Sequence, residues 1–137
     1  MKKRLHILIG GADERDNPKG NNDYPRLFEL AYNARKTDWS TPKDVQPGDR
    51  ALIYIQSPQS AIIAKCVIRS NAYKTSPDDS YDYRATVDTF KVLPKDWIDI
   101  RALKRAFPGW SKLHRMQSHA TVPEKYAEKL WATVHKK

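Results

Sequence analysis

A basic and aromatic stretch, from Ile100 to Pro123, carries the residue types best suited to chemistry with an anionic partner. The stretch contains no Asp or Glu, but it does contain Phe107 and Trp110. Its candidate phosphate-binding side chains are Arg101, Lys104, Arg105, Lys112 and Arg115. Basic groups neutralise phosphates, and aromatic rings stack on bases. The stretch therefore predicts a nucleic-acid-binding surface. The alternative is a solvated helix face with a buried Phe and an exposed Trp.

A second group of basic residues surrounds Trp39, which stands just before an apolar run. Arg35, Lys36 and Lys43 flank this Trp, and we assign Lys43 to phosphate binding. An aromatic residue at the mouth of a small barrel has two interpretations. It can close the core as a lid, or it can form one wall of a pocket for a flat ligand.

Residues that usually carry catalysis do not form a recognisable constellation in this sequence. His114 and His119 have no Cys partner at zinc-site spacing. Cys66 lies within an apolar run, as a buried and unreactive thiol would. Gly10-Gly11 follows a predicted strand but lacks the Lys-Ser/Thr of a phosphate loop. We therefore expect a non-enzymatic protein with no metal and no cofactor.

Composition sets the broad class of the protein. The chain has 137 residues, which predicts one domain spanning residues 1–137. The net charge of +9 favours an anionic partner, and nucleic acid is the commonest one. One cysteine excludes a disulfide framework within the chain, and no apolar run is long enough to span a membrane. We expect a monomeric cytoplasmic protein.

The first half of the chain is predicted to contain strands around one helix. Leu5–Ile9 is a short apolar run typical of a strand. A helix is predicted from about Tyr24 to Arg35, with Asp23 as its cap. Pro47-Gly48-Asp49 signals a turn, and strands follow at 50–55 and 61–68, paired as a hairpin.

The second half is predicted to contain one long strand and two helices. Along residues 83–92 the apolar positions shift phase by one residue, which predicts a β-bulge. Asp99 can cap a helix from Ile100 to Phe107, and a strand is possible near Met116. Pro123 can open a last helix whose apolar stripe includes Trp131, which we expect in the core. The predicted class is α+β, with a small, strongly curved β-barrel flanked by helices.

This order of signals resembles the PUA-like superfamily, in particular the EVE domains and their YTH relatives. The resemblance rests on Trp39-Ser40-Thr41, the Gly-Asp turn, the strand ending at Tyr54, and the strand at 61–68. It extends to Arg115-Met-Gln-Ser-His119, Pro123 and the final amphipathic helix. It implies a curved barrel with a hole for one base. YTH domains read N6-methyladenine in RNA, and similar EVE-like domains form the DNA-reading modules of modification-dependent restriction systems, including McrB-type ones.

The resemblance also implies roles for individual residues in a base-binding pocket. Trp39 matches a cage wall, and Ser40 matches the position that touches the base edge. Tyr54 and Ile55 match the strand end beneath the pocket, and Gln117 and Ser118 match the segment that closes it. The second wall remains open between Trp110, Trp97, Tyr81 and Tyr83.

The function predicted from the sequence is the flipping and reading of a modified base in DNA. The base would be methylated adenine or methylated or hydroxymethylated cytosine, and a fused or separate nuclease or NTPase would act as partner in a restriction or defence system. Such a reader must extrude the base, at a cost of roughly a few kcal/mol. The alternatives are a YTH-like or ASCH-like RNA reader, and a small ASCH-type hydrolase.

Overall fold

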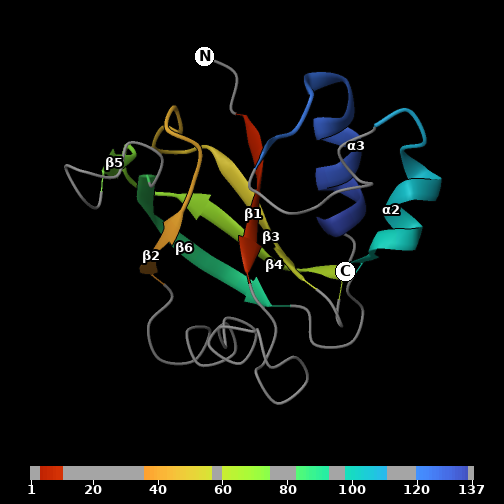
Figure 1. Ribbon diagram of the computed structural model, residues 1–137, viewed down its shortest axis with the longest axis horizontal. Helices are drawn as coiled ribbons and strands as arrows, with labels where there is room; N and C mark the ends of the chain where they lie inside the picture. The colour runs from red at the N-terminus through yellow and green to blue at the C-terminus, as the bar shows by residue number, and fades with distance from the viewer. Residues whose placement is uncertain are drawn as a thin grey trace.

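The computed structural model describes residues 4–10, 36–56, 60–74, 83–92, 98–110 and 120–135. These residues form a curled mixed sheet with helices on one side (Figure 1). The predicted helix at 24–35 and the possible strand near Met116 lie outside the described residues. The α+β class and the strongly curved sheet predicted from the sequence are both confirmed.

The centre of the sheet is built by three apolar strands. β1 (Leu5–Gly10) runs parallel to β3 (Arg50–Ile55), and β3 pairs antiparallel with β4 (Ala61–Ile68), which confirms the predicted hairpin. Ala51–Ile55 is buried throughout, as expected of a strand covered on both faces. Gly48 has φ of 90° in the predicted turn before β3, a conformation that glycine adopts without steric cost.

The outer strands complete the curl. β6 (Tyr83–Val92) pairs with β4 and with β2 (Lys36–Ser40), so the Trp39 segment is a strand. Among the described strands the order is β2-β6-β4-β3-β1-β8, where β8 is Ala120–Thr121. β5 (Tyr73–Lys74) pairs with β6, and β7 (Ile98–Asp99) pairs with β4. The predicted bulge in β6 is confirmed, because Cys66 pairs with Thr89 and Lys65 with Lys91, which leaves Phe90 as the extra residue.

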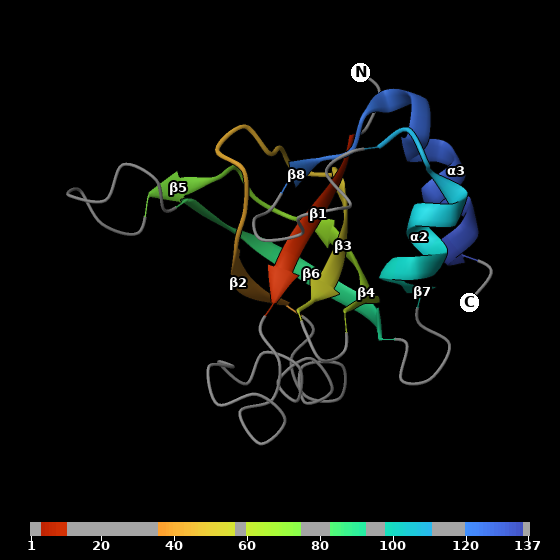
Figure 2. The ribbon, with the colours of Figure 1, turned by 45° about the vertical axis from the view of Figure 1, so that its right-hand side comes forward.

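Two helices cover one face of the sheet. α2 (Ile100–Ala106) and α3 (Glu124–His135) lie side by side over this face in both views (Figures 1 and 2). The predicted stripe of α3 is confirmed, since Ala127, Leu130 and Val134 are buried and Trp131 packs partly buried against the same cluster.

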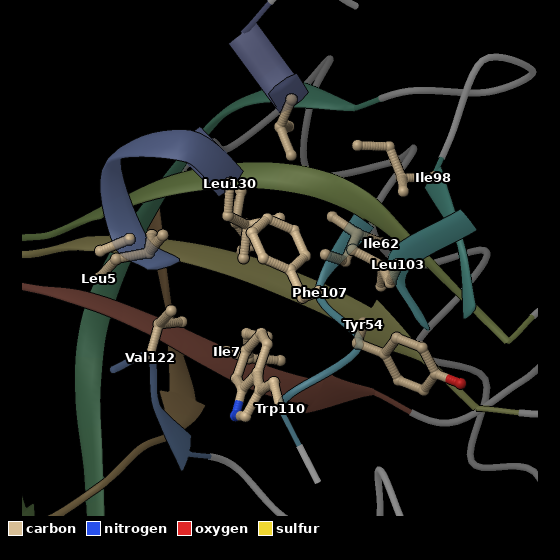
Figure 3. Close-up of a cluster of buried hydrophobic side chains, with 13 residues drawn as sticks. Leu5, Ile7, Tyr54, Ile62, Ile98, Leu103, Phe107, Trp110, Val122 and Leu130 are labelled. Atoms are coloured by element: carbon tan, nitrogen blue, oxygen red, sulfur yellow. The ribbon is translucent and has the colours of Figure 1, made fainter. Parts of the chain in front are cut away.

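The buried side chains form two clusters, separated by the sheet. The helix-side cluster fills the space between the sheet and the two helices, and Figure 3 shows several of its members: Leu5, Ile7, Tyr54, Leu103, Phe107, Trp110 and Leu130. The barrel-side cluster fills the inside of the curl and includes Leu8, Trp39, Val45, Ile55, Ile63 and Ala85. Because successive strand residues point to opposite faces, neighbours in β3 are divided between the two clusters.

Candidate nucleic-acid interface

The outward face of α2 presents three basic side chains. Asp99 begins this helix, because its Oδ1 accepts a hydrogen bond from the backbone N–H of Ala102 at 2.8 Å. Leu103 anchors the inward face in the helix-side cluster. Arg101 and Arg105 are exposed and Lys104 is partly exposed. Their spacing places them on one side of the helix.

Two lysines of α3 extend this basic surface. Lys129 is exposed, and its Nζ lies 3.4 Å from the carbonyl oxygen of Ala106, the last residue of α2. Lys125 is also exposed, one turn earlier on α3. We define the basic helix surface as Arg101, Lys104, Arg105, Lys125 and Lys129. Lys125 and Lys129 were not among the predicted phosphate-binding residues, because both follow Pro123, where the acid-free stretch ends. Their i, i+4 spacing on the predicted last helix was the available signal.

An aromatic cluster lies directly behind the basic helix surface. Phe107 meets Trp110 edge-on at 6.2 Å between ring centroids, and Trp110 stacks on Tyr126 at 5.8 Å. The Nζ of Lys129 lies 5.3 Å from the centroid of the Phe107 ring. Trp110 is only 6% exposed, so its ring packs in the core and leaves Tyr126 as the partly exposed ring of the cluster.

Trp39 lies inside the curled sheet. It is 4% exposed, and its indole Nε1 donates a hydrogen bond to the carbonyl oxygen of Ile9 at 3.1 Å. It belongs to the barrel-side cluster with Val45 and Ile55. Ser40, its neighbour, is partly exposed at the end of β2. This packing is what the core-lid interpretation requires of Trp39.

The residues assigned to one base pocket are divided between the two faces of the sheet. Trp39 and Ile55 belong to the barrel-side cluster, whereas Tyr54 and Trp110 belong to the helix-side cluster. Burial raises the pKa of the Tyr54 hydroxyl, although a hydrogen bond with Ser60 partly opposes that rise. The structure therefore does not bring these four side chains into a single pocket.

The remaining predicted residues are separate from α2 or outside the described part of the chain. Lys43 is exposed on the loop between β2 and β3. This loop starts from β2, which lies on the opposite side of β1 from α2 (Figure 2). The predicted positions that lie outside the described residues are Lys112, Arg115, Gln117 and Ser118, together with Trp97 and Tyr81. Tyr83 is partly exposed at the start of β6.

Two further properties concern the described residues alone. They contain no group of three or more His, Cys, Asp or Glu side chains that could hold a metal ion. None of the helices in this part of the chain is both long enough and apolar enough to cross a membrane.

Solved structures with a similar fold include an ASCH domain from Zymomonas mobilis. It aligns with a TM-score of 0.56 over 96% of each chain, at 10% sequence identity. The fold is ASCH-like. This likeness agrees with the predicted PUA-like superfamily at the level of fold.

Two other solved proteins also have a fold similar to that of this chain. Rpa0253 from Rhodopseudomonas palustris aligns with a TM-score of 0.64 and 16% identity, over 93% of this chain and 89% of that one. Atu2648 from Agrobacterium tumefaciens aligns with a TM-score of 0.55 and 12% identity, over 89% and 86%. No protein-family model and no curated protein matches the sequence. At these identities the likeness is one of fold.

Proposed function

We propose that this chain is a nucleic-acid-binding module that contacts phosphates through the basic helix surface. The observation that carries the proposal is the outward face of α2, where Arg101, Lys104 and Arg105 are presented on a helix without a single carboxylate. Phosphate contacts supply a large share of affinity for nucleic acid, and they do not depend on base sequence.

The position of the surface supports the proposal. α2 is anchored by Leu103 beneath and by the Asp99 cap, so the three cations are held on a fixed element. Lys129 joins α2 to α3 and brings a further cation beside them. Several phosphates of one strand can therefore meet charges whose spacing is already set.

The finer proposal is that the nucleic acid is DNA carrying a modified base, read near Trp39. Its support is the sequence resemblance to EVE and YTH domains and the place of Trp39 at the end of β2. In the described residues the Trp39 indole is covered, so base reading requires that its face become accessible when the nucleic acid binds. The module is proposed to bind without cutting, and the purified chain should leave DNA and RNA intact.

Salt-dependent binding tests the coarser proposal. Fluorescence anisotropy would measure affinity for labelled DNA and RNA oligonucleotides at a series of salt concentrations. Arg101→Ala, Lys104→Ala and Arg105→Ala should each reduce the salt slope by about one phosphate contact, or roughly 0.9 in log–log units on duplex DNA. Lys74→Ala is the matched control, because Lys74 is exposed on β5. Figure 1 shows β5 at the opposite end of the molecule from α2.

The same assay tests whether the chain reads a modified base in DNA. The panel should include unmodified, N6-methyladenine, 5-methylcytosine and 5-hydroxymethylcytosine oligonucleotides. A preference for one modified DNA supports base reading. Salt-sensitive binding without such a preference supports phosphate binding alone and contradicts base reading. Affinity that does not change with salt for any oligonucleotide would contradict both. If Lys43→Ala reduced the salt slope and the three α2 variants did not, the interface would lie on the other side of the sheet.

A further inference from the structure

A partly exposed aromatic ring lies beside the lysines of the basic helix surface. Tyr126 follows Lys125 on α3 and precedes Lys129 by less than one turn, and both lysines are exposed. Nζ of Lys125 lies 5.0 Å from the centroid of the Tyr126 ring. The ring is therefore accompanied by cations that can bind phosphate.

The core holds this ring in place. Tyr126 stacks on Trp110 with an interplanar angle of 26°, and it meets Phe107 edge-on at 5.5 Å between centroids. Phe107 and Trp110 are both buried. Two buried rings and one exposed ammonium group thus contact Tyr126, which places its ring at the boundary between the core and the solvent. A ring held in this way loses little further freedom when a ligand stacks on it.

The hydroxyl end of Tyr126 lies against the turn that follows α2. A methyl group added to the exposed Gly109 would lie 3.0 Å from the Tyr126 hydroxyl oxygen, which is closer than ordinary van der Waals contact. Glycine at this position therefore allows the ring to approach the backbone of the turn. The orientation of the ring is set both by α3 and by this turn.

Charge distinguishes two rows of side chains along α3. Lys125 and Lys129 form one row, and Glu124 and Glu128 form the adjacent one, since the members of each pair are four residues apart. The two carboxylates line a pocket of about 410 Å³, whose other lining residues are Arg4, Leu5, Thr121, Val122, Pro123 and Ala127. Carboxylates repel phosphates, so an anionic strand should follow the lysine row, where the Tyr126 ring lies.

We propose that Tyr126 stacks on an unpaired base, so that the basic helix surface holds a single strand of nucleic acid. Binding of this kind rests on the proposed phosphate contacts and specifies the strand that they hold. In a duplex the faces of the bases are covered by their neighbours, so a protein ring can stack only on a base that is out of the stack. Cations along the backbone and a ring under a base bind single strands with little dependence on sequence.

Lys125 changes its partner when the strand binds. In the unbound chain its ammonium group lies over the Tyr126 ring, and such a contact is weak at an exposed site. A phosphate can replace it, because the ammonium–phosphate contact releases counterions from the strand. Movement of Lys125 to the phosphate uncovers the ring for the base attached to the same stretch of backbone.

An abasic oligonucleotide separates stacking from phosphate binding. Fluorescence anisotropy at one fixed salt concentration would compare a labelled single-stranded DNA, an abasic strand of the same length, the matching duplex and an RNA of the same sequence. The two DNA single strands carry the same phosphates, but only one of them offers bases. The parent chain should bind the strand with bases roughly 5- to 100-fold more tightly than the abasic strand.

Variants of Tyr126 identify the ring that is responsible. Tyr126→Ala should remove most of the difference between the two DNA single strands and leave the affinity for the duplex unchanged. Tyr126→Phe keeps the ring and should bind as the parent does. Tyr126→Leu keeps an apolar side chain against Phe107 and Trp110 but lacks the ring, so it should lose the preference without exposing the core. A melting curve for each variant establishes that it is folded.

Tyr73→Ala is the matched control. Tyr73 is an exposed tyrosine on β5, and β5 lies at the opposite end of the molecule from α2 (Figure 1). Its removal should leave the preference for bases intact.

Three results would overturn stacking by Tyr126. They are equal affinity of the parent for the abasic strand and the strand with bases, a folded Tyr126→Leu that binds as the parent does, and an equal loss in Tyr73→Ala. If the α2 variants still reduced the salt slope, phosphate binding would stand without base stacking. Affinity that does not change with salt for any oligonucleotide would instead contradict the proposed function itself.

Discussion

At the scale of single residues, Trp39 is the clearest example of a side chain that packs the inside of the curled sheet. Its ring is buried among barrel-side residues, and its indole N–H is satisfied by the carbonyl oxygen of Ile9. A buried Trp with a satisfied N–H contributes packing as well as a hydrogen bond. Its removal therefore has a predictable effect on the free energy of unfolding.

We expect Trp39→Ala to lower the free energy of unfolding by about 3–5 kcal/mol, through the cavity that it leaves. Urea denaturation followed by far-UV circular dichroism would measure this loss without relying on Trp fluorescence. Trp131→Ala is the control and should cost less, because Trp131 is only partly buried and lies against the guanidinium of Arg50, 5.0 Å from the ring centroid. An unchanged Trp39→Ala stability with lost nucleic-acid binding would instead favour the pocket-wall interpretation.

Asp49 links stability to pH. Burial raises the pKa of Asp49, but hydrogen bonds from His6, Gln46 and Arg4 outweigh that effect. Its folded-state pKa is lower than the ordinary value, so its stabilisation is present above the unfolded-state pKa of about 4 and is lost as pH falls through the folded pKa. We expect the free energy of unfolding to decrease below about pH 4, and Asp49→Asn to flatten that decrease. Urea melts at pH 2.5 to 7 would measure it.

Asp44→Asn provides the comparison for Asp49. The pKa of Asp44 is also lowered, chiefly by its hydrogen bond with Arg4, but the carboxylate is 61% exposed. Solvent weakens exposed ion pairs, so this variant should change the acid dependence less. A larger effect at Asp44 than at Asp49 would contradict the role given to the buried carboxylate.

At the scale of elements, α2 depends on the residue that begins it. The helix has seven residues, and short helices gain much of their stability from packing and caps. Asp99 accepts from the Ala102 N–H, while its backbone pairs with Ala61 through β7. The cap thus joins the sheet to the helix that carries the basic residues.

We expect Asp99→Ala to cost about 1 kcal/mol of stability, because the first turn of α2 loses its side-chain acceptor. Asp99→Asn should retain most of that stability, since the amide oxygen can accept the same hydrogen bond. Chemical denaturation of the three proteins side by side would show the difference. Equal losses in both variants would mean that charge, and not capping, is what Asp99 contributes.

At the scale of the whole molecule, the charge is unevenly placed. The basic helix surface lies on α2 and the outer side of α3, whereas carboxylates of α3 line the pocket beside Thr121. Arg105→Ala should therefore change the salt slope of nucleic-acid binding, whereas a change at the pocket lining should not.

The local elements could be predicted from the sequence because their signals are local. The run 50–55 is apolar on both faces, and the structure makes it a central strand. The phase shift before Phe90 predicted the bulge in β6, and Asp99 and Pro123 predicted where helices begin. Each signal concerns neighbouring residues, whose period, cap or turn is largely independent of distant contacts. The basic face of α2 was predictable for the same reason, because the spacing of Arg101, Lys104 and Arg105 is a local signal.

The grouping of distant side chains was decided only by the tertiary structure. Tyr54 and Ile55 were assigned to one pocket from resemblance, but the pleat of β3 turns them to opposite faces. His6, Asp49 and Thr121 carry no shared motif, because 43 residues separate His6 from Asp49 and 115 separate it from Thr121. They meet because β1 lies between β3 and β8 in the sheet. Strand order depends on how the whole chain buries its apolar residues. The sequence by itself therefore determined the local elements and the basic face of α2, whereas only the fold brought Thr121, His6 and Asp49 together.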